Sequence, residues 1–292
     1  MQTMEQNEGI AAFTAALPAL RGDVHRYLAR MTGSVIDGED ILQDTLLAAA
    51  GALQKGAEVR NMRAWLFRIA HNTAMNAFRA QKREADMKEH LINMPPMPQP
   101  EPTQQLPEAL TPYLALTPLQ RSVVILRDVL GYSAAEVSNL VDTSVPAVKS
   151  ALSRGRVALS EAREAATDQT TKLPEPQVQA LRRYASLFNA HDFDGLRDML
   201  SAEVRLELVS VEKRTGKAKV SGYYSKYAEQ NDWLMVPGHV EGAPAILVAD
   251  RNDPNGPPAY FILLDLSAKG VSAIRDFRYA RYVMPDTSWQ RL

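Results

Sequence analysis

Hydrophobic and polar positions alternate with helical spacing over residues 142–159, DTSVPAVKSALSRGRVAL. Ser144 is a favourable N-cap, the proline two residues later is tolerated in a first turn, and nothing breaks the pattern before Gly155. The apolar positions share one side of the helical projection: Val145, Val148, Ala151, Leu152 and Leu159. The opposite side carries Lys149, Ser150, Ser153 and Arg154. The pattern predicts an amphipathic helix whose exposed face holds short hydrogen-bond donors and two cations.

A second short helix is predicted directly before it. In YSAAEVSNLV, Ser133 is the expected cap, and the apolar positions are Ala134, Val137, Leu140 and Val141. Two short helices across a tight turn, the second with an exposed donor face, are typical of a helix-turn-helix whose second helix enters a DNA major groove. An ordinary helical hairpin with a solvated face is the alternative.

Periodicity and composition divide the chain into three parts. Residues 10–90 hold three helical runs, and residues 108–165 hold further helices that end in the helix-turn-helix. Later residues form one helix, PQVQALRRYASLFNAHD, and then β-like runs: VRLELVSV, AKVSGYY, AILVAD, AYFILLDL and VSAIRDFRYARYV. We therefore expect two all-α domains and a C-terminal α+β domain with one long helix on a curved antiparallel sheet.

Two proline-containing segments mark the expected boundaries. NMPPMPQPEPTQQLP, residues 93–107, cannot continue a helix and favours an extended linker. TDQTTKLPEP is a second break. The expected organisation is a helical domain over 1–93, a linker over 94–107, a helical domain over 108–166, a linker over 167–176 and a C-terminal domain over 177–292.

Composition narrows the class of protein. The 292 residues have a net charge of −1, so a nucleic-acid partner requires locally segregated charge. The absence of cysteine excludes disulfides and thiolate metal sites, and the five histidines show no metal-ligand spacing. No stretch approaches the roughly 20 apolar residues of a membrane span, and the N-terminus lacks a signal-peptide pattern. We expect a cytoplasmic protein that binds neither metal, cofactor nor membrane.

Two charge blocks lie in the first part of the chain. DGEDILQDTLL places four carboxylates within eight residues, at positions 37, 39, 40 and 44. The helix dipole favours acids in a first turn, which explains Asp37 to Asp40 but explains Asp44 less well. Residues 59–83 carry six cations and no acid. The expected buried stripe of this helix consists of Trp65, Leu66, Ile69, Thr73 and Ala77. An acid-free run interleaved with Asn and aromatic residues is typical of a surface that contacts phosphates and bases.

Both blocks resemble a known family. DGEDILQDTLL followed by RAWLFRIAHNTAMNAFRAQKR resembles region 2 of the bacterial extracytoplasmic-function sigma factors, the subunits that direct RNA polymerase to promoters. LTPLQRSVVILRDVLGYSAAEVSNLVDTSVPAVKSALSRGRVAL is similar to their region 4. The resemblance covers roughly residues 10–165 in family order. It implies binding to the β′ and β subunits of the polymerase core and to promoter DNA, with the linker over 94–107 running through the polymerase.

The resemblance also implies roles for individual residues. Docking on the clamp coiled coil of β′ is expected for Asp37, Asp40, Gln43 and Asp44. Binding of the −10 element and its opened strand is expected for Arg63, Arg68, Asn72, Asn76, Arg79, Lys82 and Arg83. Contact with the −35 element is expected for Ser144, Lys149, Ser150, Ser153 and Arg154.

Residues 177–292 resemble the SnoaL-like, or ketosteroid-isomerase-like, fold, a conical α+β barrel around a pocket. The similarity rests on element order and on FNAHDFDGLRDMLSAEVRLEL. Some sigma factors of this kind carry such a domain after an LPEP linker instead of using a separate anti-sigma protein, and Leu173, Pro174, Glu175 and Pro176 match that linker. The DGGGK-like loop of the best-known group is replaced here by EKRTGKAKVSG.

Barrels of this type can host acid/base chemistry. The available groups are His191, Asp192, Asp265, Tyr223, Tyr224 and Tyr279. A position in a turn explains the histidine, and packing in a sheet explains the tyrosines, so the residues favour ligand sensing over catalysis. The sequence as a whole predicts an alternative sigma factor, not an enzyme, that its C-terminal domain regulates in cis. The alternatives are a ligand-binding or isomerase-like enzyme with a DNA-binding appendage, and a sigma mimic that sequesters an anti-sigma factor.

Overall fold

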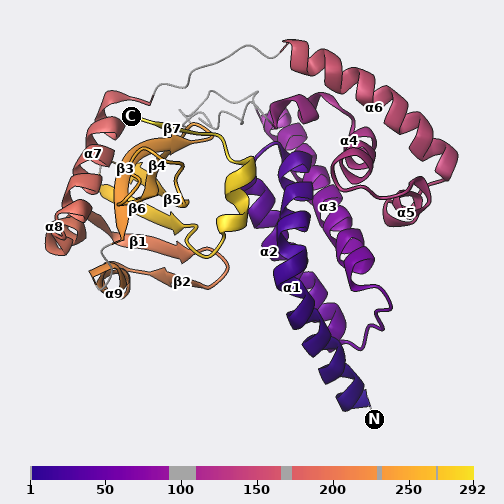
Figure 1. The fold of residues 1–292 in the computed structure, drawn as a ribbon, viewed down its shortest axis with the longest axis horizontal. Coiled ribbons are helices and arrows are strands. Elements are labelled where there is room, and N and C mark those ends of the chain that lie inside the picture. Colours follow the sequence, from indigo (N-terminus) through magenta and orange to yellow (C-terminus); the bar gives the residue numbers. More distant parts are fainter. Residues whose placement is uncertain (1, 92–109, 166–172, 229–231, 268) are drawn as a thin grey trace. The chain divides into compact units, whose positions relative to one another are not determined.

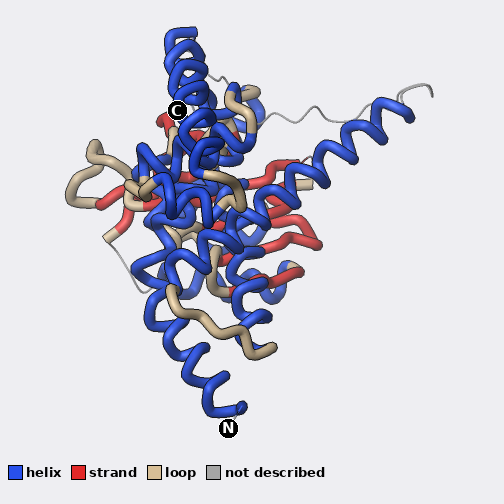
Figure 2. The backbone as a smooth tube through the Cα atoms, turned by 90° about the vertical axis from the view of Figure 1, so that its right-hand side faces the viewer, coloured by secondary structure: helices blue, strands red, loops and turns tan. Residues whose placement is uncertain are grey.

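A computed structural model describes residues 2–91, 110–165, 173–228, 232–267 and 269–292 (Figure 1). The described residues form two compact units, one ending at residue 165 and one beginning at residue 173. The strands in Figure 2 all belong to the second unit, whereas the first consists of helices, turns and loops. The predicted linker over 94–107 lies outside the described residues.

The N-terminal unit begins with three long helices that pack on one another. They are α1 (Gln2–Thr32), α2 (Val35–Gln54) and α3 (Met62–Leu91). Their shared core contains fully buried Val24, Tyr27, Leu42 and Leu66. The prediction for residues 59–83 placed the buried stripe at Trp65, Leu66, Ile69, Thr73 and Ala77, but the buried positions are Leu66, Phe67, Ala70 and Ala74. The helix is therefore rotated relative to the prediction, because its neighbours cover the side that carries Phe67.

The second half of this unit consists of shorter helical segments. They are η1 (Thr111–Ala115), α4 (Pro118–Val124), η2 (Ile125–Val129), α5 (Ala134–Leu140) and α6 (Val145–Ala165). Capping boxes begin two of them, where Thr117 and Ser133 each accept a hydrogen bond from the third residue of the helix. The predicted Ser133 cap is thus confirmed. Asp142 adopts φ of 52° in the turn between α5 and α6, a left-handed conformation that reverses the chain within a few residues.

Helix α6 does not end at Gly155 but continues to Ala165. Gly155 is buried, and a Cβ atom there would lie 2.8 Å from Cγ2 of Val124 on α4. The glycine therefore permits close approach of two helices. Sequence analysis treated Gly155 as the point where the helical pattern breaks. The neighbouring residues of the sequence do not show that this glycine packs against another helix.

The C-terminal unit combines helices with a single mixed sheet. Its helices are α7 (Glu175–Asn189), α8 (Phe193–Asp198), α9 (Lys217–Ala228) and η3 (Arg281–Asp286). Its strands are β1 (Leu200–Leu208), β2 (Glu212–Thr215), β3 (Trp233–Val240), β4 (Ala243–Asp250), β5 (Tyr260–Ser267), β6 (Gly270–Asp276) and β7 (Trp289–Arg291). The strand order is β2-β1-β6-β5-β4-β3-β7. The predicted α+β class is confirmed.

Two details of this unit differ from the prediction. Strands β1 and β6 pair in parallel, so the sheet is mixed and not purely antiparallel. AKVSGYY was predicted to be a strand and lies within α9. Val220, Tyr223, Tyr224 and Tyr227 are all buried and recur with spacings of three and four residues, which is helical periodicity. That signal was present in the sequence but was outweighed by the β propensity of valine and tyrosine.

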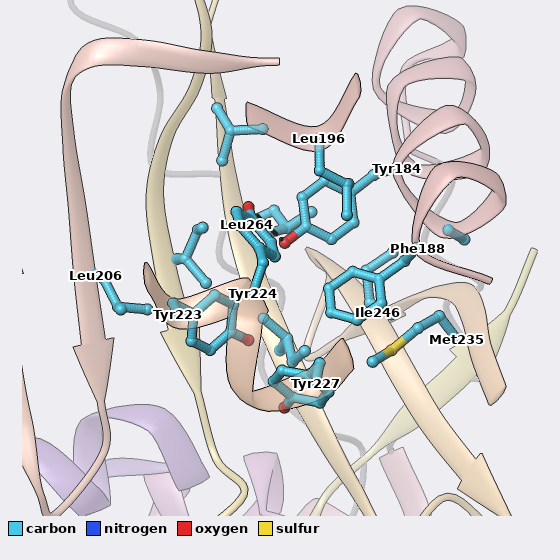
Figure 3. Close-up of a cluster of buried hydrophobic side chains, with 14 of the residues drawn as sticks. Tyr184, Phe188, Leu196, Leu206, Tyr223, Tyr224, Tyr227, Met235, Ile246 and Leu264 are labelled. Carbon is cyan, nitrogen blue, oxygen red and sulfur yellow. Dashed lines mark hydrogen bonds between the residues drawn. The ribbon is translucent and has the colours of Figure 1, made fainter. Parts of the chain in front are cut away.

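Aromatic side chains fill the interior of the C-terminal unit (Figure 3). Phe188 of α7 meets Tyr227 of α9 and Trp233 of β3 in edge-to-face contacts with ring centroids 5.1 and 5.0 Å apart. Edge-to-face packing at these distances stabilises the cluster beyond the burial of its area. Leu196, Leu206 and Ile246 close the cluster from the neighbouring helix and sheet.

Candidate nucleic-acid and polymerase interfaces

Helix α3 presents most of the predicted −10 residues as one exposed stripe. Arg68, Asn72, Asn76, Arg79 and Arg83 are all exposed and follow one another at spacings of three or four residues. Such spacing places the side chains on one face of a helix. Lys82 is exposed beside the stripe. The face thus combines cations with amides along more than four helical turns, which suits a strand that offers phosphates and base edges.

Helix α6 presents the predicted −35 residues on the side away from its buried face. Lys149, Ser150, Ser153 and Arg154 are exposed, whereas Val148, Ala151, Gly155 and Leu159 are buried. The Ser144 hydroxyl accepts a hydrogen bond from the Ala147 amide at 3.3 Å, so this residue caps the helix. The arrangement gives α6 a protruding donor face of the kind that reads base edges in a major groove.

The acidic block separates into structural and exposed residues. Glu39 is fully buried and lies 3.4 Å from Arg21, and Asp37 is half-buried in the first turn, where Ser34 caps the helix. Asp40 and Asp44 are exposed. Because Asp44 stands in the third turn of α2, the helix dipole does not account for it.

An apolar side chain extends the same surface. Leu47 is 71% exposed and follows Asp40 and Asp44 at helical spacing, with the partly exposed Gln43 beside them. Sequence analysis did not select this leucine. The helical repeat of 40, 44 and 47 was the available signal.

Arg63 differs from the other predicted −10 residues because it is partly buried and already bonded. Its Nη1 lies 2.8 Å from Oδ2 of Asp23, and its Nε donates to the Tyr132 hydroxyl at 2.8 Å. Burial opposes the charge of this guanidinium, but Tyr132 and Asp23 together raise its pKa. Tyr132 belongs to the segment that precedes α5. The segment before α5 therefore contacts the first turn of α3, the helix that carries the predicted −10 stripe.

Arg68 makes a second such contact. Its Nη2 donates to the backbone carbonyl of Asn139 on α5 at 2.7 Å. A cavity of about 620 Å³ lies between these segments and is lined by Arg63, Trp65 and Arg68 on one side and by Tyr132, Glu136 and Asn139 on the other. The exposed Arg68 at the start of the predicted −10 stripe is thus hydrogen-bonded to α5.

A buried polar network joins the same two regions. The Arg121 guanidinium on α4 donates to the carbonyl of Met31 near the C-terminus of α1, and also to those of Leu114 and Leu116 at 3.1 and 3.0 Å. Burial lowers the pKa of this group, and the carbonyls at a helix C-terminus favour a cation.

Three further side chains continue this network. The Tyr27 hydroxyl donates to Oγ of Ser122 at 3.2 Å and lies 2.9 Å from Nδ1 of His71. Burial raises the pKa of Tyr27 and lowers that of His71. Both side chains are consequently favoured in their neutral forms, as a buried hydrogen-bonded group should be.

The candidate catalytic groups of the C-terminal unit are not assembled into one site. Asp265 and Asp192 are exposed, and Tyr279 is 50% exposed. His191 lies in the predicted turn, with φ of 57°, and stacks on Trp233 at 5.3 Å. Tyr223 and Tyr224 are buried, and they lie on helix α9 and not on a strand. The scattered placement favours the structural explanation for each group.

Sequence analysis missed the buried carboxyl group of this unit. Asp276 ends β6 without exposed surface, and its Oδ2 accepts hydrogen bonds from Tyr223 and Tyr227 at 2.9 and 2.8 Å. Burial raises the pKa of Asp276, and the tyrosine hydroxyls partly offset that effect. The sequence VSAIRDF did not indicate that Asp276 is buried. The burial of a carboxyl group at the end of a strand depends on the helix that covers that strand.

The predicted LPEP linker is partly structural. Helix α7 begins at Glu175, so Glu175 and Pro176 form its first turn, and Pro174 precedes them as the N-cap residue. Proline suits this position because its missing N–H has no helical partner there. Leu173 is partly buried against the core of the C-terminal unit. The four residues therefore belong to that unit rather than to a free connection.

The described residues contain no group of His, Asp or Glu side chains that could hold a metal ion. None of the described helices is long and apolar enough to cross a membrane.

Comparison with known proteins identifies the class to which the N-terminal unit belongs. The family model for Sigma-70 region 2 matches residues 19–84, and that for Sigma-70 region 4 matches residues 114–159. The first match contains the acidic block and residues 62–84 of α3, and the second contains α5 and the exposed face of α6 predicted to contact the −35 element. The unit thus contains regions 2 and 4 of a sigma-70-type factor.

Curated relatives place the chain in a particular family. ECF RNA polymerase sigma factor SigM of Mycobacterium tuberculosis is 33% identical over 144 residues, which cover 47% of this chain and 69% of that protein. ECF RNA polymerase sigma factor SigG of the same species is 32% identical over 225 residues, covering 67% of this chain. The match spans 61% of the length of SigG. The chain belongs to the extracytoplasmic-function (ECF) RNA polymerase sigma factors.

Two solved structures also match the chain. The crystal structure of the Mycobacterium tuberculosis extracytoplasmic-function sigma factor SigJ covers 90% of this chain and 95% of its own, at 18% identity and a TM-score of 0.34. A crystal structure described as that of a "putative ketosteroid isomerase" from Kribbella flavida matches 35% of this chain and 76% of that protein, at 19% identity and a TM-score of 0.28.

Proposed function

We propose that this protein is an alternative sigma factor that binds the RNA polymerase core and directs it to promoters. The observation that carries the proposal is the pair of exposed faces on α3 and α6, both present in a chain of the ECF family. One face offers cations and amides along a continuous stripe, and the other offers short donors and cations on a helix-turn-helix. These are the chemical requirements for holding an opened strand and for reading a duplex.

The residue roles follow from the exposed positions. Arg68, Asn72, Asn76, Arg79, Lys82 and Arg83 are assigned to the −10 element, with Arg63 at the start of the stripe. Lys149, Ser150, Ser153 and Arg154 are assigned to the −35 element, with Ser144 as the helix cap. Asp40, Gln43, Asp44 and Leu47 are assigned to the polymerase, whereas the half-buried Asp37 contributes to the helix start.

Exposed promoter residues favour this function over the sigma mimic. A protein that only sequesters an anti-sigma factor needs no cations on the reading helices, yet Arg79, Lys82, Lys149 and Arg154 are all exposed. The enzyme alternative gains no support, because the candidate acid/base groups of the C-terminal unit lie apart from one another.

The test is run-off transcription with purified core polymerase over a panel of genomic promoters, including the promoter of the protein's own gene. We expect transcripts that depend on the added protein and start at a fixed distance from shared −10 and −35 sequences. Core polymerase that binds the protein without producing any transcript would contradict the proposal and favour the mimic.

We further propose that the C-terminal unit regulates the sigma regions in cis. Residues 166–172 tether it directly behind α6, which keeps its effective concentration beside those regions high. A small molecule that binds this unit changes transcription only through different affinities for two arrangements of the chain.

A further inference from the structure

The cavity between the start of α3 and helix α5 has walls of different chemistry. Its volume of about 620 Å³ lies within the roughly 300–1,000 Å³ range of small-molecule sites. The wall from α3 carries two guanidinium groups and an indole, those of Arg63, Arg68 and Trp65. The wall from α5 carries the Glu136 carboxylate and the Asn139 amide. The cavity therefore suits a ligand that combines an anionic group, an aromatic ring and hydrogen-bond donors.

Arg68 is the cation that a ligand can reach. It is exposed, and although its Nη2 donates to the Asn139 carbonyl, the described contacts give its Nε and Nη1 no partner. Arg63, in contrast, is already bonded to Asp23 and Tyr132. Guanidinium N–H groups form charge-assisted hydrogen bonds with phosphate oxygens. The α3 wall thus offers one position for a phosphate group.

Glu136 supplies an acceptor on the opposite wall. Its Oε2 accepts a hydrogen bond from the Ser133 backbone amide at 2.7 Å, and no described contact involves its Oε1. Hydrogen bonds with Ser133 lower the pKa of this carboxyl group, so it is ionised and only accepts at neutral pH. Asn139 is exposed one turn later on α5, and its side-chain amide is unpaired among the described residues. Spacing of three residues places the carboxylate and the amide on one face of the helix.

Trp65 provides an aromatic surface for a planar ligand. Its side chain is partly exposed and meets Phe13 edge to face, with ring centroids 6.3 Å apart. Tyr132 also lines the cavity, but it is 8% exposed and packs on Phe67. A nucleobase stacks favourably on an aromatic side chain. Trp65 is therefore the ring in this cavity that can receive a base.

The carboxylate discriminates among the nucleobases. Guanine presents two adjacent donors, N1–H and the 2-amino group, beside the acceptor O6. A carboxylate accepts from both donors, and an asparagine amino group next to it donates to O6. Adenine and the pyrimidines lack two adjacent donors and would turn a lone pair toward the carboxylate. Guanine is thus the common nucleobase that the α5 wall matches.

We propose that the cavity between α3 and α5 is a binding site for a guanine nucleotide. Glu136 accepts from N1–H and the 2-amino group, Asn139 donates to O6, the base stacks on Trp65, and the phosphates lie at Arg68. This site goes beyond the sigma-factor function, and binding of the nucleotide requires neither DNA nor polymerase.

Displacement of a fluorescent nucleotide from the full-length protein tests the class of ligand. The probe is N-methylanthraniloyl-GDP, and the competitors are GDP, IDP, ADP and inorganic pyrophosphate. IDP differs from GDP only by the missing 2-amino group. We expect GDP to displace the probe below about 1 mM. The other three should be about tenfold weaker or more, because each loses hydrogen bonds to a charged carboxylate.

Two outcomes of this titration contradict the proposal. The absence of saturable probe binding would show that the cavity holds no nucleotide. Equal displacement by GDP and pyrophosphate would show that phosphate binds to the cations of α3 without recognition of the base.

A matched pair of variants tests recognition of the base. Glutamine also completes a capping box, so Glu136→Gln keeps the start of α5 and removes the charge. We expect this variant to bind GDP about tenfold more weakly and to lose the preference for GDP over ADP, with pyrophosphate displacement unchanged. Glu161→Gln makes the same change at an exposed position of α6 and should behave like the wild type. Equal GDP affinity in all three proteins would refute the guanine site.

Tryptophan fluorescence locates the bound base. The chain has three tryptophans, and Trp233 and Trp289 lie on strands of the C-terminal unit. GDP should quench the fluorescence of the wild type, whereas Trp65→Phe should still bind GDP and show no quenching. Quenching that persists in Trp65→Phe would place the nucleotide elsewhere. Failure of the wild type in run-off transcription would contradict the sigma-factor function but not nucleotide binding, so the two proposals fail separately.

Discussion

Tyr227 donates a hydrogen bond of 2.8 Å to Oδ2 of Asp276, a carboxyl group with no exposed surface. Tyr223 donates to the same oxygen at 2.9 Å, and the Arg278 amide donates to Oδ1 at 2.8 Å. The carboxyl group thus joins helix α9 to the end of strand β6. Its burial in an aromatic core makes its protonation a determinant of stability.

The first prediction concerns the pH dependence of that stability. Burial raises the pKa of Asp276 above its ordinary value of 3.8. The native state therefore holds the proton to a higher pH than the unfolded state does. This group's contribution is fully present below 3.8 and is lost as pH rises through the folded-state pKa. Unfolding of wild type and Asp276→Asn, followed in urea between pH 3 and pH 8, measures the difference.

Asp276→Asn removes this titration, so the stability of the variant relative to wild type should increase with pH across that window. The variant should also lose roughly 1–3 kcal/mol of stability, because the NH2 group of asparagine cannot accept a hydrogen bond and so leaves either the two tyrosines or the Arg278 backbone amide without an acceptor. A constant difference between the two proteins at every pH would show that Asp276 does not titrate in this range.

The second prediction contrasts two glycines within helices. Gly155→Ala places a Cβ 2.8 Å from Val124, and we expect a loss of about 1–3 kcal/mol from overpacking. Gly51→Ala has no atom within 4 Å of the new Cβ, and helix propensity should stabilise it by about 0.5–1 kcal/mol. Urea denaturation of both variants is the measurement. A stabilised Gly155→Ala protein would show that α4 and α6 do not pack as described.

The third prediction tests the reading face of α6. Arg154→Ala should cost roughly 1–3 kcal/mol of discrimination at the −35 element, whereas Lys149→Ala should weaken binding more uniformly if it meets phosphate. Arg156→Ala is the matched control, because this arginine of the same helix is already bonded to Asp128 at 2.6 and 2.8 Å. Transcription from promoters with altered −35 sequences measures the effect. Normal initiation by the Arg154→Ala, Lys149→Ala protein would exclude α6 as the reader.

The fourth prediction tests the exposed acidic face of α2. Loss of a desolvated charge partner at an interface typically costs 2–5 kcal/mol or more. A protein with Asp40→Lys and Asp44→Lys should therefore fold normally but fail to bind core polymerase in a titration. Leu47→Ser should weaken binding by about 1–3 kcal/mol, as expected for an apolar side chain that becomes buried on binding.

The control for this surface changes the same charge elsewhere. Glu161→Lys and Glu203→Lys replace two exposed acids on α6 and β1. That protein should bind core polymerase like the wild type. If the control and the α2 variant lose affinity equally, overall charge and not the α2 surface governs association.

The fifth prediction concerns the C-terminal unit. Truncation after Ala166 and truncation after Pro176 should both change transcription relative to the full chain, because both remove a tethered domain. They should also differ from each other if Leu173 to Pro176 contact the sigma regions. Run-off transcription at one promoter compares the three proteins. Equal transcription by all three proteins would show that the C-terminal unit does not regulate the sigma regions.

Local patterns in the sequence determined the elements and the family. Ser133 and Ser144 indicated the starts of two helices. The spacing of the apolar residues from Val148 to Leu159 predicted the buried face of one of them. The acid-free segment that ends at Arg83 indicated a surface that contacts nucleic acid. These features can be recognised in a single sequence because helix capping, hydrophobic periodicity and charge segregation each depend on only a few neighbouring residues.

Tertiary structure decided the rest, for reasons that lie between distant segments. The need for a glycine at position 155 within α6 comes from the close approach of Val124, which lies 31 positions earlier. The burial of Asp276 depends on tyrosines of a helix mistaken for a strand, and the engagement of Arg63 depends on Tyr132, 69 positions away. Close packing and buried hydrogen bonds each involve two groups. The pattern along one segment identifies only one of these groups, and the other becomes known only from the tertiary structure.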